Sequence, residues 1–181
     1  MNKVGKVCGI IACLALGAFG CQKESKTGTL IVKMVDAPVE FDSVNVEIID
    51  FQVHYSNGLM GESDWVSLET NEGIYNLLDL QDGVTAVLVD GEEVPIGKLQ
   101  QMRLILGEDN TVVVEDETYP LELSSQDKNG IKINLKSTIH EGDSVEIILD
   151  FDAQKSIVIQ GNDDDQFKLK PVIKLEEIIY Y

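Results

Sequence analysis

Cysteine is absent from most of this chain: all three cysteines lie in the first 21 residues, the last of them at Cys21. The residues after Cys21 therefore hold no disulfide, no thiolate nucleophile and no cysteine-based zinc site. Histidine is nearly as scarce, because only His54 and His140 exist, and no G-x-S-x-G segment typical of serine hydrolases accompanies them. The sequence predicts a protein that is not an enzyme, with a hydrolase as the residual alternative.

Positive charge is scarce too, with 14 Lys+Arg against 32 Asp+Glu and a single arginine, Arg103. The formal net charge of −18 excludes nucleic acid as a partner, because binding to phosphate backbones depends on clusters of basic residues. Anionic lipid headgroups repel such a surface for the same reason, so attachment to a membrane requires an anchor other than charge. The excess of carboxylates leaves weak contact with calcium open.

The apolar stretch near the N-terminus is too short for a permanent membrane span. Residues 7–20 form 14 consecutive uncharged residues, whereas a transmembrane helix needs about 20. Lys3 and Lys6 precede this stretch, and the small residue Gly20 ends it. This arrangement is typical of a secretory signal peptide, which we assign to residues 1–20.

A cysteine directly after a signal peptide indicates a bacterial lipoprotein, in which the thiol carries acyl chains such as palmitate. Cys21 follows "AFG", which ends in the required small residue. Cys13 is the alternative, because "IIAC" fits the tripeptide rule better, but cleavage there leaves an apolar region of only six residues after Lys6. We predict lipidation at Cys21 and attachment to the membrane through this anchor. The opposing interpretation treats the cysteine as one more small apolar residue.

The residues after Cys21 form a short polar tether. With Cys21 it spans residues 21–28, and its seven residues "QKESKTG" reach roughly 23 Å when extended. Gln22 gives no reason for retention at the inner membrane, and Lys23 followed by Glu24 resembles a signal that sends some lipoproteins to the cell surface. The predicted location is the outer membrane, with the cell surface and the periplasmic leaflet as alternative faces.

Apolar residues alternate with polar ones along most of the remaining chain, as in half-buried β-strands. Turn sequences rich in Asp, Asn and Gly separate these segments. Residues 29–181 are predicted to form one all-β domain, an antiparallel β-sandwich of the immunoglobulin-like or transthyretin-like kind. The predicted strands cover residues 29–36, 43–55, 101–107, 105–123, 130–139, 143–153 and 165–177.

Three local features qualify this pattern. A change of phase after Ile48 predicts a β-bulge within segment 43–55. Residues 77–88 have a mixed pattern that could hold a short helix. Pro171 lies inside the last predicted strand, which indicates an edge position or an amide that faces away from a neighbour.

Four segments resemble an uncharacterised family of exported proteins, often lipoproteins, called domain of unknown function 4382. They are "DAP" at residues 36–38, "RLILG" at 103–107, "DFDA" at 150–153 and "KPVIK" at 170–174. The resemblance covers roughly residues 28–175, so it implies one exported domain over nearly the whole chain after the leader. It implies no activity, cofactor or ligand.

Several side chains are candidates for a binding site or a structural ion pair, and the two candidate binding sites each have a simpler interpretation. The acidic segment 161–165 with Asp150 and Asp152 is a candidate for calcium, but it lacks EF-hand spacing, so a solvated hairpin tip is the alternative. Arg103 is predicted to form a cross-strand ion pair with Asp150 or Asp152. Trp65 could stack on a sugar, although packing in the core or at an edge is the simpler expectation.

The function predicted from these features is that of an outer-membrane lipoprotein, a non-enzymatic binding or accessory module without a cofactor. The ligand is not identified, and its partner could be a protein or a glycan. An adhesin or pilus-type subunit and a carbohydrate-binding accessory protein are the alternatives.

Overall fold

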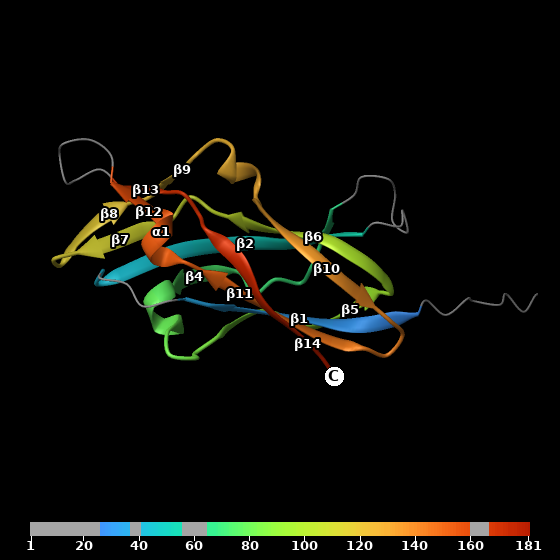
Figure 1. Ribbon diagram of the computed structural model, residues 1–181. Coiled ribbons are helices and arrows are strands. Elements are labelled where there is room, and N and C mark those ends of the chain that lie inside the picture. Colours follow the sequence, from blue (N-terminus) through green and yellow to red (C-terminus); the bar gives the residue numbers. More distant parts are fainter. Residues whose placement is uncertain (1–25, 37–40, 56–64, 160–166) are drawn as a thin grey trace, which may run out of the picture.

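The fold consists almost entirely of β-strands arranged in layers (Figure 1). The computed structural model describes residues 26–36, 41–55, 65–159 and 167–181. The proposed acylation site Cys21 and the acidic segment 161–165 lie outside the described residues. In chain order the elements are β1 (Thr27–Val35), β2 (Ser43–Tyr55), β3 (Val66–Ser67), β4 (Gly73–Asn76), the 3-10 helix η1 (Leu77–Leu80), β5 (Ala86–Pro95), β6 (Gly97–Leu106), β7 (Thr111–Val114), β8 (Glu117–Pro120), β9 (Glu122–Leu123), the 3-10 helix η2 (Asp127–Asn129), β10 (Ile131–Ile139), β11 (Ser144–Phe151), α1 (Ala153–Ser156), β12 (Ile157–Ile159), β13 (Phe167–Leu169) and β14 (Ile173–Tyr180).

One sheet has the order β14–β11–β1–β5, and we call it the first sheet. Leu30, Val32 and Met34 of β1 are buried, as their alternation with polar residues predicts. β1 pairs antiparallel with β5 but parallel with β11. The parallel pair departs from the expected antiparallel arrangement, because alternation reports which face a residue lies on and not the direction of the neighbouring strand.

Two predicted boundaries in this sheet differ from the structure. β1 begins at Thr27, inside the segment assigned to the tether, because Thr27 pairs with Pro95 of β5, and its carbonyl also accepts a hydrogen bond from the amide of Gly142 (3.0 Å). One of the Asp- and Gly-containing sequences expected to form turns, "VDG" at residues 89–91, lies within β5, where the register against β1 shifts. A bulge absorbs these turn-forming residues without ending the strand.

The second sheet has the order β10–β6–β2–β7–β8, with β3 and β4 also paired to β2. The predicted bulge in β2 is confirmed: the register against β6 shifts between Ile48 and Asp50. Ile48 and Phe51 are both buried, while Ile49 between them is 41 % exposed. The bulge thus lets one long strand keep its apolar side chains on a single face despite the change of phase.

The core lies between the two sheets, which face each other in Figure 1 with β2 and β6 above β1 and β5. Burial of an aliphatic or aromatic side chain contributes about 1.5–3 kcal/mol, so the inner faces supply the main stabilisation. The protein is therefore a single all-β domain with a sandwich-like core, as predicted. The largest fully buried side chains are Phe51, Phe151, Leu30, Met34, Ile48, Leu77, Leu88, Leu99, Met102, Leu104, Ile139 and Ile147.

The C-terminal segment changes sheets. Residues 165–177 were expected to form one strand, but Phe167 and Leu169 lie in β13 of a small sheet β12–β13–β9, whereas the chain from Ile173 onward forms β14 of the first sheet. Pro171 lies in the break between them and not within a strand. Its missing amide hydrogen and fixed φ explain why the ladder stops there. β14 then pairs antiparallel with β11 at the edge of the first sheet.

The short helical elements add little to the layers. η1 falls in the segment 77–88 for which a short helix was considered, and α1 is a single turn between β11 and β12. No helix in the described ranges has the length and apolar character needed to cross a membrane.

Candidate functional site

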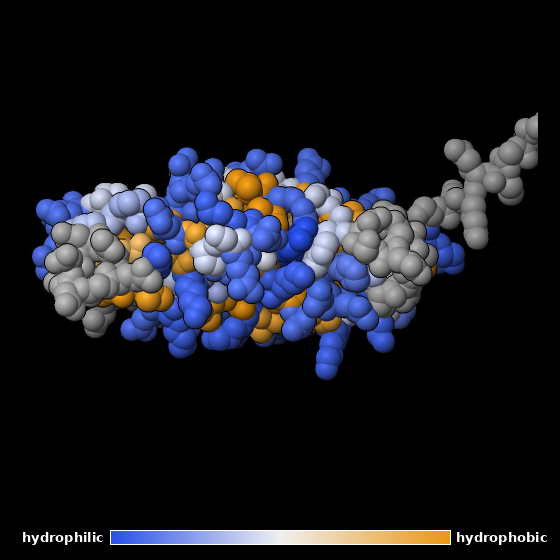
Figure 2. All heavy atoms as spheres, turned by 90° about the horizontal axis from the view of Figure 1, so that it is seen from above, coloured by the Kyte–Doolittle hydropathy of each residue, from blue (hydrophilic) through white to orange (hydrophobic). Residues whose placement is uncertain are grey.

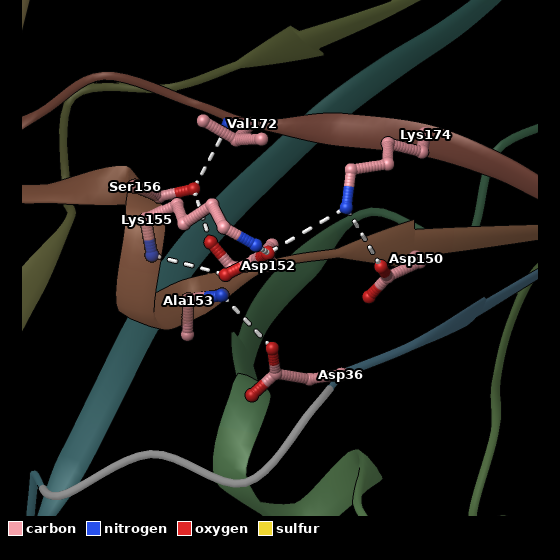
Figure 3. Close-up of polar contacts among 8 residues, drawn as sticks. All are labelled: Asp36, Asp150, Asp152, Ala153, Lys155, Ser156, Val172 and Lys174. Atoms are coloured by element: carbon pink, nitrogen blue, oxygen red, sulfur yellow. Dashed lines mark hydrogen bonds and ion pairs between the residues drawn. The ribbon is translucent and has the colours of Figure 1, made fainter.

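Three segments far apart in the sequence meet where β1 and β11 end (Figure 3). Asp36 follows β1, residues 150–153 end β11 and begin α1, and residues 170–174 connect β13 to β14. Because β1 and β11 run parallel, their carboxyl ends lie at the same edge of the sheet. Three of the four segments that carry the family resemblance are therefore neighbours. We call this cluster of Asp36, Asp152, Ser156 and Lys174 the strand-end junction.

Hydrogen bonds join the three segments of the junction. Asp36 Oδ1 accepts a hydrogen bond from the backbone amide of Ala153 (2.9 Å), which ties β1 to α1. Ser156 Oγ donates to the carbonyl of Asp152 (2.6 Å) and accepts from the amide of Val172 (2.9 Å). The buried hydroxyl thus links α1 to the segment that leads into β14, and it satisfies backbone groups that would otherwise be costly to bury.

Asp152 is the N-cap of α1 and the electrostatic centre of the junction. Its Oδ1 accepts from the backbone amide of Lys155 (3.0 Å), and its Oδ2 accepts from Lys155 Nζ (2.5 Å). Lys174 Nζ lies 3.6 Å from both Asp152 Oδ2 and Asp150 Oδ2, so it bridges the two carboxylates (Figure 3). Burial alone raises the pKa of Asp152, but the hydrogen bonds from Lys155 and the charges of Lys155 and Lys174 together lower it.

This arrangement stabilises the fold and offers no site for chemistry as it stands. Ser156 is fully buried with its hydroxyl engaged as donor and acceptor, so no substrate reaches it. Asp150 and Asp152, which were considered for calcium, are bonded to lysines. Among the described residues no group of three or more His, Cys, Asp or Glu could hold a metal ion. Segment 161–165 lies outside those residues, so its calcium contact stays a prediction.

The predicted ion pair of Arg103 with Asp150 or Asp152 is wrong. Arg103 lies on β6 in the second sheet, whereas both aspartates lie at the end of β11 in the first sheet. Two strands that each alternate in the same way were taken as neighbours, but they belong to opposite layers of the sandwich. The side chain of Arg103 points outward from the second sheet, where it meets a different set of partners.

The outer face of the second sheet carries two rows of polar side chains across β10, β6, β2 and β3. One row is Lys132–Arg103–Gln52–Ser67, and the next contains Asn134, Gln101 and His54. Their neighbours in sequence point into the core. Figure 2, which views the molecule from above, shows hydrophilic residues predominating on this side, with hydrophobic ones in small separate areas.

Arg103 is held on this face by Trp65 and Gln52. Its guanidinium carbon lies 4.5 Å from the centroid of the Trp65 ring, within the range of a cation–π contact. Its Nε donates to Gln52 Oε1 (3.0 Å), and a second guanidinium nitrogen donates to the same oxygen. Lys132 Nζ lies 5.8 Å from the Trp65 ring. Trp65 therefore lies at the outer surface of the sheet and not in the core, and two cations lie near its ring.

Gly130 shapes the pocket for the Arg103 side chain. Its backbone has a φ of 96°, and a Cβ placed there would lie 2.6 Å from Arg103 Cγ and 2.4 Å from Ile105 Cδ1. Only glycine allows both this conformation and this close approach. The residue that precedes β10 thus lets the arginine stem lie flat on the sheet, with its charged end over Trp65.

Among the residues that the structure describes, the cations on this face have no carboxylate partners. β6 and β10 contain Lys98, Arg103, Lys132 and Lys136 and no Asp or Glu. Each of the four has at least one buried neighbour in sequence, and none forms an ion pair within the described ranges. We call these four residues with Trp65 the basic face. It is an unusual surface on a chain with a net charge of −18.

The two histidines lie in different surroundings. His140 lies in a turn, where its amide and its Nδ1 both contact Asp143 Oδ2 (2.8 and 2.9 Å). The His54 ring lies 5.4 Å from Trp65 with the planes tilted by 52°. Its Nδ1 is buried and bonds to no group of the described chain, so it has neither the acid nor the nucleophile of a triad at that atom.

Reasoning from the sequence missed most of the basic face. No sequence motif marks Gln52, Gly130 or Lys132 as a site residue, because each residue type is common in β-sheet proteins. A usable signal was present in the strands: the two alternating segments around Arg103 and Lys132 contain only basic charges, in a chain where acids outnumber bases more than twofold. Cys21, the one predicted site residue of the N-terminal segment, lies outside the described residues, so its lipidation stays a prediction.

Comparison with known proteins supplies a family but no activity. The model of one protein family, described as Domain of unknown function (DUF4382), matches residues 27–171. Neither the curated proteins nor the solved structures contain a match to the chain.

Proposed function

The chain belongs to the DUF4382 family, whose description names no activity, and we propose that it is a lipid-anchored, non-enzymatic binding module of the outer membrane. In this proposal Cys21 carries the acyl chains, and the basic face binds the ligand. The observation that carries the proposal is the half-buried guanidinium of Arg103, which Trp65 and Gln52 orient and which has no carboxylate partner in the described part of the chain.

The position of β1 supports display close to a membrane. β1 begins at Thr27, so five residues separate it from Cys21 and can extend at most about 20 Å. With residues 1–20 removed, 12 Lys+Arg remain against 32 Asp+Glu, so electrostatic repulsion from anionic headgroups favours an orientation held by the acyl chains alone. The motif Lys23–Glu24 favours the cell surface as the exposed side.

The accessory role in carbohydrate binding gains support from one feature. The side-chain amides of Gln52, Gln101 and Asn134 lie on the same outer face as Arg103, in its own cross-strand row or the next one. Amide groups pair readily with hydroxyl groups, since they both donate and accept hydrogen bonds. His54 and Trp65 are not coplanar, so the face does not present a row of stacked aromatic rings.

Intact-mass spectrometry of the protein extracted from native membranes tests the anchor. We expect a chain that begins at Cys21 and carries the added mass of acyl chains, and protease treatment of whole cells reports its side of the membrane. Cys21→Ser should abolish acylation and release the protein from the membrane, whereas the matched variant Cys13→Ser should leave both unchanged. Acylation that survives Cys21→Ser, or is lost in Cys13→Ser, would contradict the assignment.

A further inference from the structure

The basic face lies on a chain that is otherwise strongly acidic. Lysines elsewhere in the described fold are mostly neutralised: Lys26 pairs with Glu141, Lys33 with Glu146, and Lys128 with Glu108. Lys98, Lys132 and Lys136 form no such pair with any described residue, although acids outnumber bases in the chain. Cations without a described carboxylate partner on so acidic a chain are suited to an anionic ligand.

The negative net charge of the chain does not cancel the positive electrostatic potential at the basic face. At physiological ionic strength the Debye length is about 8 Å, so carboxylates farther away than that are largely screened. Asp50, the acid next to the Arg103 row, accepts hydrogen bonds from the neutral side chains of Gln52 and Ser67 (2.9 Å for Ser67 Oγ) and keeps its negative charge. Because β6 and β10 carry four cations and no acid, a ligand that touches these two strands still meets mainly positive charge, while the remaining surface repels anions.

Trp65 holds a cation and does not offer a free stacking surface toward Arg103. The guanidinium occupies one side of the ring at 4.5 Å, and the His54 ring lies 5.4 Å away at a tilt of 52°. A neutral sugar recognised by stacking on an open aromatic face is thus a poor match. The tryptophan orients the arginine, and Arg103 presents nitrogens in the geometry that suits carboxylate or sulfate groups.

The spacing of the cations favours a polymer over a small anion. Lys132 and Lys136 are four residues apart on β10, about 13 Å for an extended strand, and Lys98 lies farther along the face on β6. No single small anion spans these positions. Between them, Gln101 Nε2 donates to Asn134 Oδ1 (2.9 Å), which leaves the other polar atoms of this amide pair available to hydroxyl groups.

We propose that the basic face binds an anionic polysaccharide, a chain of hydroxyl-rich sugars with regularly spaced carboxylate or sulfate groups. In this complex Arg103 binds one anionic group while Trp65 and Gln52 hold it in place, and Lys98, Lys132 and Lys136 contact further groups along the polymer. The Gln101–Asn134 pair contacts hydroxyls between them. The assignment rests on the proposed function only in taking this face as the binding surface, and it does not depend on lipidation.

Binding to matched polymers tests the assignment with the full-length protein in detergent micelles. Dextran sulfate and dextran share a backbone and differ in charge, and polygalacturonate and its methyl ester differ in the same way. We expect calorimetry to detect binding of both charged polymers and not of the neutral ones. Emission of Trp65, the only tryptophan, should change on binding, and affinity should fall as salt increases.

Substitutions on the basic face test whether the polymer binds there. Arg103→Gln and the double variant Lys132→Gln with Lys136→Gln should each weaken binding of polygalacturonate by about tenfold, which corresponds to the loss of one or two charged hydrogen bonds. The double variant leaves the Arg103–Trp65 contact intact, so it tests the face even if Arg103→Gln impairs folding. Lys168→Gln is the matched control, because Lys168 is exposed and unpaired but lies on β13 in the small sheet.

Four results would overturn the assignment. They are binding of dextran equal to that of dextran sulfate, equal binding of polyglutamate or an oligothymidylate, no binding of any polymer, and equal weakening in the Lys168→Gln control. These results are independent of the membrane anchor. A protein without acyl chains that binds polygalacturonate refutes only the anchor, and an acylated protein that binds no polymer refutes only the ligand class.

Discussion

Replacement of Asp152 by alanine should destabilise the fold through the strand-end junction. Asp152 caps α1 with Oδ1 and pairs with two lysines through Oδ2, while its own side chain is only 8 % exposed. Alanine removes both interactions at once. Asparagine keeps an oxygen for the cap and removes the charge, so the two variants separate the cap from the ion pairs.

The expected magnitude follows from these contacts. Loss of an N-cap costs about 1 kcal/mol. The charged contacts contribute about 1 kcal/mol more, since the side chains of Lys155 and Lys174 are 65 % and 54 % exposed and solvent screens their interaction with the carboxylate. Asp152→Ala should therefore lower the free energy of unfolding by about 2 kcal/mol, and Asp152→Asn by about 1 kcal/mol.

The charge-dependent part should vary with pH in a defined direction. The net effect of burial, hydrogen bonds and lysine charges is to lower the pKa of Asp152 in the fold. Its contribution is fully present above the unfolded value, near 3.8, and is lost as the pH falls through the lower folded value. The stability difference between the native protein and Asp152→Asn should thus be constant near neutral pH and shrink in acid, because the other carboxyl groups are common to both proteins.

Urea unfolding followed by the emission of Trp65 measures these differences at pH 7 and in acid. The midpoint should fall while the slope with denaturant stays unchanged. Asp90→Asn is the matched control, because Asp90 is exposed on β5, and it should change stability by less than about 0.5 kcal/mol. Equal losses for alanine and asparagine would refute the role of the charge. A loss below about 0.5 kcal/mol for alanine would refute the cap.

Three further substitutions give distinct outcomes. Phe51→Ala, at a fully buried position in the centre of β2, should cost about 3–5 kcal/mol in urea unfolding. Gly130→Ala should displace the Arg103 stem and strain the backbone, which a changed emission spectrum of Trp65 would report, whereas an unchanged spectrum would show that the arginine does not depend on this glycine. Ser156→Ala leaves the partly buried amide of Val172 without its acceptor and should cost about 1–3 kcal/mol of unfolding free energy, and thermal unfolding without a shift would contradict this linkage.

The alternation of apolar and polar residues predicted the strands and their buried faces, but not the direction in which neighbouring strands run. Alternation identified the buried faces of β1, β2, β10 and β11, because a half-buried strand must place apolar residues at every second position. It could not show that β1 and β11 run parallel, since direction leaves no mark on this pattern. It also joined β13 to β14, because "FKLKPVIKL" alternates without interruption and only Pro171 marks the change of sheet.

The sites were harder to predict, because they depend on which strands are neighbours. The segments around Asp36, Asp150 and Pro171 were recognised one by one, and the parallel pair brings them together at one edge. Arg103 was assigned the wrong partners for the same reason: a charged residue on a strand indicates a cross-strand partner but not the sheet that supplies it. Trp65 and Gln52, its actual partners, lie 38 and 51 positions away in sequence.

The strand-end junction and the basic face lie on different sheets and share no described contact, so their effects should separate. Asp152→Asn should lower stability and leave the affinity for polygalacturonate unchanged, and Lys132→Gln should weaken binding and leave unfolding unchanged. The double variant should then show the sum of both effects, because interactions without shared partners add. Coupling between the two would mean that the junction positions the second sheet, and the binding surface would depend on the part of the fold where the family resemblance is concentrated.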